Sequence, residues 1–302
     1  MIKGANNKDQ DRPGFDSLRS LLFSPARDMR KMQKALESGA DAVLLDLEDS
    51  VAEADKGLAR ALAVEALRRP RKNIVVVRVN APDTTHHLAD LAAILSAAPD
   101  AIMLPKCSSM ADISRLAAQI DILEVAYGLA AGGVNILPLV TESASALAGM
   151  AYQGASPRVQ ALCFAAEDLS ADLGIMARRD HVMHPLLEQA RRQLIIQAAA
   201  AGLPAIDTPF PNTSDLMGLK QEADEAAYLG FSGKLCIHPT HIAIIHEAFK
   251  PSAERLVWAK AVLATLENRT AGVGIVDGKM VDLAHVKLAR RYLRQAGSEQ
   301  NS

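Results

Sequence analysis

The chain has few aromatic residues and few cysteines. Aromatic side chains make up 4% of the 302 residues and include one tryptophan, Trp258, so the core must be mainly aliphatic. An aliphatic core is typical of parallel sheets that helices cover. The three cysteines, Cys107, Cys163 and Cys236, form no CxxC pair and no zinc-ligand spacing. Cys163 and Cys236 lie inside apolar runs, so we expect buried, unreactive thiols, which is compatible with a cytoplasmic protein.

The chain also lacks an excess of charge and any long apolar run. Its net charge of −2 and its pI near 6.5 argue against a surface that coats nucleic acid. No run of about 18 apolar residues occurs, so no membrane span is expected. The segment from Met1 to Asp16 is polar and lacks the apolar stretch of a secretory signal. We therefore expect neither nucleic acid nor a membrane among the partners.

Short apolar runs recur along the chain, and stretches with helical spacing separate them. The helical stretches are rich in Ala and Leu, as in residues 110–119 and 187–200. Near-continuous apolar strands that alternate with helices predict a parallel sheet. The eight predicted strands cover residues 19–24, 42–47, 74–79, 101–105, 135–140, 159–164, 204–207 and 234–238.

The number of these units decides the fold class. Eight strand–helix units in about 250 residues are typical of a closed barrel. The alternative, a doubly wound open sheet, would place a glycine-rich phosphate turn after the first strand. This chain has Ser24-Pro25-Ala26-Arg27 there instead. We therefore predict an α/β fold, a (β/α)8 TIM barrel with a C-terminal helical extension.

The predicted organisation has three parts. Residues 1–18 form a flexible N-terminal arm, residues 19–250 the catalytic barrel, and residues 251–302 the extension. Helical spacing within the extension covers residues 253–266 and 283–295. A barrel needs no such extension to close, so this segment could cap the barrel or reach a neighbouring subunit.

Polar residues follow several of the predicted strands, at the end of a barrel where its chemistry takes place. Carboxylates without cysteine or paired histidine suit magnesium or manganese. Arg78 and Lys106 suit a carboxylate substrate, which Arg78 can hold through two parallel hydrogen bonds. A metal and an arginine together can stabilise an enolate. The polar strand ends are Asp46, Glu48 and Asp49; Arg78 and Asn80; Lys106; Glu142; Glu167 and Asp168; and His238.

Structural roles are the alternative for each of these side chains. Glu142 and Asp168 could each cap the helix that follows them. Asp46, Glu48 and Asp49 could favour a helix N-terminus through the macrodipole. Arg78 could form a structural ion pair, although we favour a ligand role because buried charge is costly. His238, before a proline, is expected to be a packed, hydrogen-bonded histidine.

The order and spacing of these motifs resemble the citrate lyase β-subunit-like family of the aldolase/citrate lyase superfamily. The resemblance begins at Arg19 and continues into the C-terminal region. The matching motifs are Arg19-Ser-Leu-Leu-Phe-Ser-Pro25, Asp46-Leu-Glu-Asp-Ser-Val51 with Lys56 and Ala59-Arg60, Val77-Arg-Val-Asn80, Leu104-Pro-Lys106, Pro138-Leu-Val-Thr-Glu142, Glu167-Asp-Leu-Ser-Ala-Asp-Leu-Gly174 and Gly230-Phe-Ser-Gly-Lys-Leu-Cys-Ile-His-Pro239. Two segments depart from it: Ala165-Ala166, where relatives commonly have glycine, and residues 82–87.

The resemblance implies a magnesium-dependent acyl-CoA lyase, with manganese as a possible substitute. It implies magnesium ligands at Glu142 and Asp168, and a homotrimer or hexamer. A C-terminal aspartate matching Asp282 would act in a neighbouring subunit's site. The full set of expected site residues is Asp282 and Arg78 for catalysis, Arg19, Glu48, Arg78 and Lys106 for substrate binding, and Glu142 and Asp168 for the metal.

The expected substrate is a 3-hydroxyacyl-CoA of the malyl-, citramalyl- or citryl-CoA type. Its cleavage would give acetyl-CoA and a 2-oxo acid, with Asp282 protonating the enolate. Three other functions remain open: a citrate lyase β subunit in a multi-subunit complex, a CoA-independent pyruvate-class aldolase, and an acyl-CoA thioesterase.

Overall fold

The computed structural model describes residues 14–179, 181–267 and 272–297. The chain divides into two compact units. One unit is Leu18–Ala248, and the other contains the described residues of Met1–Ser17 and of Phe249–Ser302. Most of the predicted N-terminal arm lies outside the described residues.

Eight parallel strands form the described core of Leu18–Ala248. Their order in the sheet is β5-β4-β3-β2-β1-β10-β9-β6, and parallel bridges from Ile136 to Val159 and from Leu139 to Cys163 link its two ends. The sheet is therefore the predicted barrel. Its strands are β1 (Ser20–Pro25), β2 (Ala42–Asp46), β3 (Ile74–Arg78), β4 (Ala101–Leu104), β5 (Asn135–Pro138), β6 (Leu162–Cys163), β9 (Ala205–Asp207) and β10 (Gly233–Cys236).

The strand sequences explain this arrangement. Every residue of β2, β3 and β4 is buried, as apolar strands covered on both faces must be. Seven predicted strands agree with the structure to within one or two residues. The sixth is shorter than predicted, because Val159 meets β5 through a single bridge and regular pairing with β9 begins only at Leu162.

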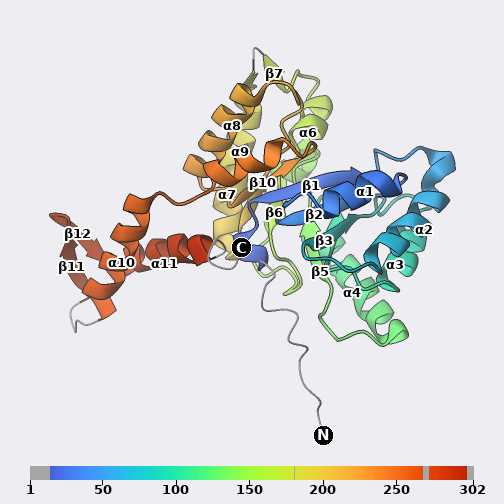
Figure 1. Cartoon of the computed structure of the whole chain (residues 1–302), viewed down its shortest axis with the longest axis horizontal. Coiled ribbons are helices and arrows are strands. Elements are labelled where there is room, and N and C mark those ends of the chain that lie inside the picture. Colours follow the sequence, from blue (N-terminus) through green and yellow to red (C-terminus); the bar gives the residue numbers. More distant parts are fainter. Residues whose placement is uncertain (1–13, 180, 268–271, 298–302) are drawn as a thin grey trace, which may run out of the picture. The chain divides into compact units, whose positions relative to one another are not determined.

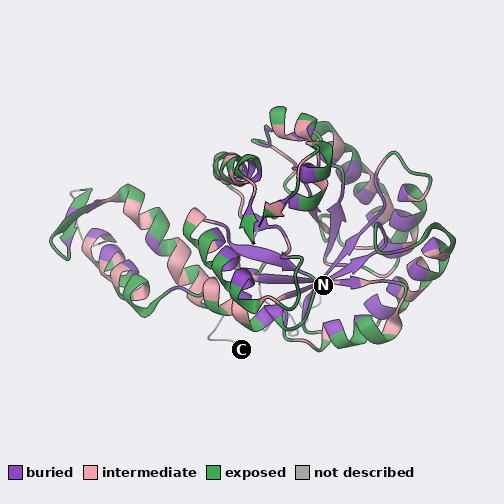
Figure 2. Cartoon of the chain, turned by 90° about the horizontal axis from the view of Figure 1, so that it is seen from above, coloured by how far each residue is buried: buried purple, intermediate pink, exposed green. Residues whose placement is uncertain are grey.

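Helices occupy the connections between the strands. Figure 1 shows α2, α3 and α4 outside the first strands, and Figure 2 shows buried strands beside helices whose outer faces are exposed. Asp28 caps the first helix by accepting bonds from the main-chain N–H groups of Arg30 and Lys31. The helices are α1 (Met29–Leu36), α2 (Lys56–Leu67), α3 (His87–Leu95), α4 (Met110–Tyr127), α5 (Ala144–Ala148), α6 (Ala166–Asp172), α7 (Pro185–Ala201), α8 (Leu216–Leu229) and α9 (His241–Ala248). None of the helices in the described ranges is long and apolar enough to cross a membrane.

A buried ion network crosses the side of the barrel formed by β9 and β10. Lys234 Nζ lies 2.6 Å from Asp207 Oδ2 and 2.7 Å from Glu222 Oε1. Arg191 Nε donates to Asp207 Oδ1 at 3.1 Å, and Arg178 Nε donates to Glu222 Oε2 at 2.8 Å. Arg178 belongs to a short antiparallel ribbon, β7 (Arg178–Arg179) and β8 (Val182–Met183). The network ties this ribbon to the barrel, and the sequence pattern gave no sign of it.

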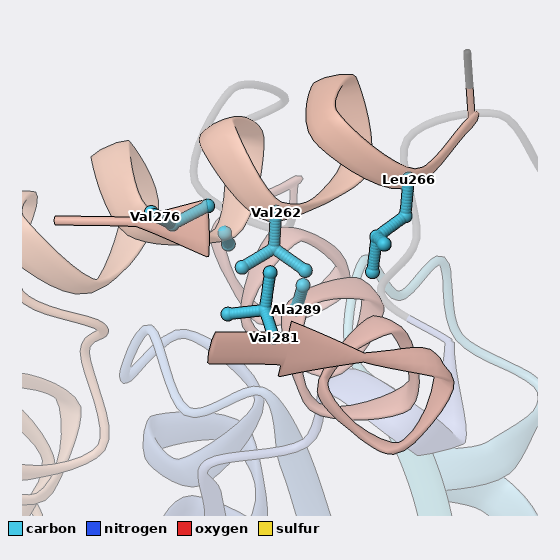
Figure 3. Close-up of a cluster of buried hydrophobic side chains, with 6 residues drawn as sticks. Val262, Leu266, Val276, Val281 and Ala289 are labelled. Atoms are coloured by element: carbon cyan, nitrogen blue, oxygen red, sulfur yellow. The ribbon is translucent and has the colours of Figure 1, made fainter. Parts of the chain in front are cut away.

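The C-terminal unit combines two helices with a hairpin. The helices α10 (Ala253–Glu267) and α11 (Leu283–Gly297) confirm the predicted helical stretches. The hairpin, β11 (Val273–Val276) and β12 (Lys279–Asp282), was not predicted. Asp277 and Gly278 form its turn with φ of 48° and 72°, the left-handed values of a type I′ turn. The unit's core is the cluster in Figure 3: Ala259, Val262, Leu266, Val276, Val281 and Ala289.

Candidate active site

The carboxyl ends of the barrel strands share one rim, where most of the predicted site residues lie. Asp46 and Arg78 are the last residues of β2 and β3. Lys106 and Glu142 follow β4 and β5, and Asp168 lies in the first turn of α6, shortly after β6. The parallel order of these strands brings residues far apart in sequence to the same edge.

Lys106 joins the two carboxylates that were predicted to hold a metal. Its Nζ lies 3.1 Å from Glu142 Oε1 and 2.6 Å from Asp168 Oδ1. Glu48 Oε1 lies 3.9 Å from the same ammonium group. The main-chain N–H of Lys106 also donates to Glu142 Oε2. Three carboxylates from different strand ends therefore surround one cation.

Glu142 is almost fully buried, with 6% of its surface exposed. Burial raises the pKa of Glu142 to about 7, although the charge of Lys106 opposes the rise. Glu142 does not cap the helix that follows it. Ser143 does so, accepting a 3.2 Å bond from the main-chain N–H of Ala146. Lys106, and not the helix that follows, therefore holds the carboxylate of Glu142 at the rim.

Arg78 lies in an acidic cluster. Its Nε and Nη2 donate to the two carboxylate oxygens of Asp46 at 2.7 and 2.8 Å. Its Nη1 lies 3.1 Å from Glu48 Oε2 and 3.3 Å from Asp49 Oδ2. Burial alone would raise the pKa of Asp46, but the hydrogen bonds and charge of Arg78 hold it below its usual value. These contacts match the ion-pair alternative, and the role of Arg78 in substrate binding stays a prediction.

Glu48 links the Arg78 cluster to Lys106. It is 6% exposed, and burial raises its pKa to about 8 despite the opposing charge of Arg78. The charges of Asp49 and Glu142 add to the rise. Burial therefore favours the protonated form of Glu48, as it does for Glu142.

A buried lysine fixes the backbone beneath this cluster, and its role was not foreseen from the sequence. Lys56, at the start of α2, donates to Leu47 O at 2.8 Å, Glu48 O at 2.7 Å and Asn80 Oδ1 at 2.6 Å. Asn80 in turn donates to Asp90 Oδ2 through its main-chain N–H and its side chain. The network holds the ends of β2 and β3 together. Its sequence signal was the lysine that follows the acidic motif.

A pocket of about 770 Å³ opens beside Glu48 and Lys106. Lys56 and Asn80 contribute to its lining, so the network borders the same space. The loop after β3 forms much of the wall. The full lining is Glu48, Asp49, Val51, Glu53, Lys56, Asn80, Ala81, Asp83, Thr84, Thr85, His86 and Lys106. The pocket is large enough for part of a substrate of the predicted size.

Arg19 lies away from this group, at the other end of the barrel. It precedes β1, and its Nε and Nη2 each donate to Asp41 at 3.1 Å. Asp41 precedes β2, so the pair sits at the amino ends of the strands. A strand of six residues is roughly 20 Å long. Arg19 therefore lies apart from Glu142 and Asp168, and its role in substrate binding stays a prediction.

Asp282 is the last residue of β12, in the C-terminal unit. Its Oδ1 lies 2.8 Å from His285 Nδ1 and accepts a 2.9 Å bond from the main-chain N–H of Ala284. The hydrogen bond with His285 holds the pKa of Asp282 below its usual value. Asp282 is therefore a carboxylate at neutral pH, and its role in a neighbouring subunit's site stays a prediction.

The carboxylates of Glu142 and Asp168 fit a hard divalent cation. Their oxygens already stabilise one positive charge, the ammonium of Lys106. Among the described residues, no cluster of three or more His, Cys, Asp or Glu side chains could enclose a metal ion. Two carboxylates suit magnesium, which keeps several positions of its octahedral shell for water and substrate oxygens.

Comparisons with known proteins agree with this geometry. The family model of the HpcH/HpaI aldolase/citrate lyases matches residues 19–239. The (3S)-malyl-CoA thioesterase of Cereibacter sphaeroides is 35% identical in an alignment 286 positions long, which covers 92% of this chain and 94% of that protein. The L-malyl-CoA/β-methylmalyl-CoA lyase of the same species is 32% identical in an alignment 301 positions long, which covers 92% of this chain and 94% of that protein.

A solved structure shares the fold. It is CitE from Mycobacterium tuberculosis in complex with magnesium, acetoacetate and coenzyme A. It aligns with a TM-score of 0.75 at 33% identity, covering 94% of this chain and 100% of that chain. Further CitE structures also contain magnesium. The similarity confirms the predicted TIM barrel with a C-terminal helical part.

Proposed function

The chain belongs to the HpcH/HpaI aldolase/citrate lyase family, and we propose that it is a magnesium-dependent carbon–carbon lyase. Its substrate would be a 3-hydroxyacyl-CoA of the malyl-, citramalyl- or citryl-CoA type, and its products acetyl-CoA and a 2-oxo acid. The observation that carries this proposal is the buried Glu142 and the half-buried Asp168, which share one cation, the ammonium of Lys106, beside the 770 Å³ pocket.

Glu142 and Asp168 would hold magnesium. The metal would supply positive charge to the carboxylate and hydroxyl oxygens of the substrate. Lys106 and Arg78 lie at the same rim and would bind the anionic end of the substrate. Lys56 and Asn80 keep the ends of β2 and β3 in place, so the substrate meets a preorganised wall.

Asp282 would move the proton on the CoA fragment. In cleavage, the hydroxyl proton would pass to a water molecule, the O–H electrons would form the carbonyl of the 2-oxo acid, and the electrons of the broken carbon–carbon bond would form the enolate of the thioester. Asp282 would take up a proton from water, give it to the enolate carbon and return to the carboxylate form. In the direction of synthesis, the ionised carboxylate removes that proton, and its lowered pKa favours this form. We propose that the C-terminal unit, residues 251–302, supplies Asp282 to the barrel of a neighbouring subunit in a homotrimer or hexamer.

The products identify the reaction. Purified protein is incubated with malyl-, citramalyl- or citryl-CoA, with magnesium or with EDTA, and all products are separated by chromatography. A lyase releases acetyl-CoA and a 2-oxo acid in equal amounts, only with magnesium. If no thioester is cleaved by the folded, magnesium-loaded protein, the proposal is wrong, and a complex subunit or a CoA-independent aldolase is favoured.

A thioesterase is the second candidate, because a relative of 35% identity carries that name. Water would then attack the thioester carbonyl, and the carbon–carbon bond would remain. The same chromatography separates the two, since a thioesterase releases free CoA and the intact hydroxy acid.

Mixed oligomers test the placement of Asp282. Glu142→Gln and Asp282→Asn subunits, each inactive alone, are unfolded together, refolded and assayed. Activity well above either parent would support a site shared between subunits. No recovery in oligomers shown to contain both chains would contradict it.

A further inference from the structure

Lys106 binds the candidate metal ligands in two separate ways. Its main-chain N–H donates to Glu142 Oε2. Its ammonium lies 3.1 Å from Glu142 Oε1 and 2.6 Å from Asp168 Oδ1. The first contact belongs to the backbone and the second to a flexible side chain. The two can therefore be separated, because the ammonium can leave while the main-chain bond remains.

The backbone of Lys106 is held in an unusual conformation. Its φ is +52°, in the left-handed region that residues other than glycine seldom adopt. Strain of this kind persists where the surrounding structure enforces it, often at functional sites. Here the conformation accompanies the main-chain bond to Glu142, which fixes that carboxylate whatever the side chain of Lys106 does.

The side chain of Lys106 borders an open pocket into which it can rotate. It is 41% exposed, and it lines the pocket together with Glu48, whose Oε1 lies 3.9 Å from Nζ. A rotation about its four-carbon stem would move the ammonium from Glu142 and Asp168 toward Glu48 and the pocket. A divalent cation on the same two carboxylates would repel the ammonium at such short range.

We propose that Lys106 is an internal counter-cation, which neutralises Glu142 and Asp168 until a divalent cation displaces its ammonium group. The main-chain bond keeps Glu142 in position throughout the exchange. The displaced ammonium then faces the pocket and binds the carboxylate of the incoming substrate, so the metal binds before the substrate. The inference rests on the proposed function only in taking Glu142 and Asp168 as the metal ligands.

The test measures metal binding without any thioester. Mn²⁺ affinity is measured by electron paramagnetic resonance of the free ion, for wild type, Lys106→Met and Lys106→Arg. Removing the competing charge should lower the Kd of Lys106→Met by about tenfold, while Lys106→Arg, which keeps the charge, should stay within about threefold of wild type. Lys220→Met is the matched control, because Lys220 pairs with Asp224 on the exposed face of α8; its Kd should not change.

Thermal unfolding gives a second readout. In EDTA, Lys106→Met should melt below wild type, because two neighbouring carboxylates lose their counter-charge. Its melting temperature should rise more than that of wild type when Mn²⁺ is added. Lys106→Gln serves in the same way if the methionine variant does not fold.

Two results would overturn the inference. One is a Kd for Lys106→Met equal to or higher than that of wild type. The other is the same tightening in Lys106→Met and Lys106→Arg, which would rule out charge as the cause. If Lys106→Met binds Mn²⁺ more tightly than wild type and Lys106→Arg does not, but the protein cleaves no acyl-CoA, this inference stands and the proposed function is wrong. If the protein is an active lyase but its Lys106→Met variant binds Mn²⁺ more weakly than wild type, the proposed function stands and this inference is wrong.

Discussion

Replacing Glu142 by glutamine should weaken metal binding and, at the same time, stabilise the metal-free protein. Glutamine keeps the shape of Glu142 and can still accept the bond from the main-chain N–H of Lys106. It removes a buried negative charge whose pKa rises from 4.5 to about 7 on folding. Because the folded state binds this proton more tightly than the unfolded chain, the metal-free wild type loses stability as the pH rises from about 4.5 to about 7.

The size of the effect follows from that pKa. At about 1.4 kcal/mol per pKa unit, the ionised Glu142 costs the fold about 3 kcal/mol at pH values above 7. The gain in stability from glutamine should be smaller than this cost, because the ammonium of Lys106 loses one partner. We expect metal-free Glu142→Gln to be about 1–3 kcal/mol more stable than wild type near pH 8. At about 2–4 °C per kcal/mol, its melting temperature should rise by several degrees. Below about pH 4.5 the difference should vanish, because Glu142 is protonated in both states.

The assay combines thermal unfolding in EDTA with magnesium titration by calorimetry. Glu65→Gln is the matched control, because Glu65 is an exposed residue of α2 paired with Arg69 at 2.6 Å. Its stability should change by less than about 0.5 kcal/mol and its magnesium affinity should not change. A Glu142→Gln protein that is less stable than wild type near pH 8 in EDTA, or that binds magnesium with wild-type affinity, would refute the reasoning.

Three further predictions concern the buried charges. Lys234→Met should destabilise the protein by about 3–5 kcal/mol in urea unfolding, because Asp207 and Glu222 would lose the cation between them; a loss under 1 kcal/mol would contradict this. Despite burial, the charge of Lys234 helps hold the pKa values of Asp207 and Glu222 below their ordinary 3.8 and 4.5. Above these ordinary pKa values the two carboxylates contribute fully to stability, and the contribution is lost as the pH falls through their lower pKa values in the folded protein. The melting temperature, measured over a series of acidic pH values, should therefore fall steeply below about pH 4. Arg78→Met should cost about 3–5 kcal/mol by leaving Asp46 unpaired, whereas Arg78→Lys should cost less; equal losses would show that the charge of Arg78 contributes nothing.

The barrel could be predicted because most of its strands are short apolar runs that can be recognised from the local sequence alone. Runs such as Ile74–Arg78 are apolar throughout, and the order of strands in a barrel repeats their order in the chain. The hairpin β11–β12 was missed although its Asp277–Gly278 turn is a strong local signal. Its strands have four residues each, and alternating apolar residues over so short a length do not stand out.

The site was predicted less completely than the fold. The expectation that functional side chains follow the carboxyl ends of barrel strands identified Lys106, Glu142 and Asp168, which the structure brings together. The positions of these residues at strand ends could not show that Arg78 donates two hydrogen bonds to Asp46, because that pairing depends on the register of β2 and β3. Arg19 was assigned through the resemblance rather than through its position before a strand, and that position places it at the opposite rim.

The most direct test of the proposed function is a magnesium titration of acetyl-CoA formation by the purified protein from malyl-, citramalyl- and citryl-CoA in turn. We predict that one of these thioesters yields acetyl-CoA and its 2-oxo acid in equal amounts, that the rate saturates with magnesium, and that EDTA abolishes it. Glu142→Gln should reduce the rate at a fixed magnesium concentration by at least about a hundredfold. Acetyl-CoA formation that is unaffected by EDTA, or the release of free CoA and the intact hydroxy acid instead, would contradict the proposed function.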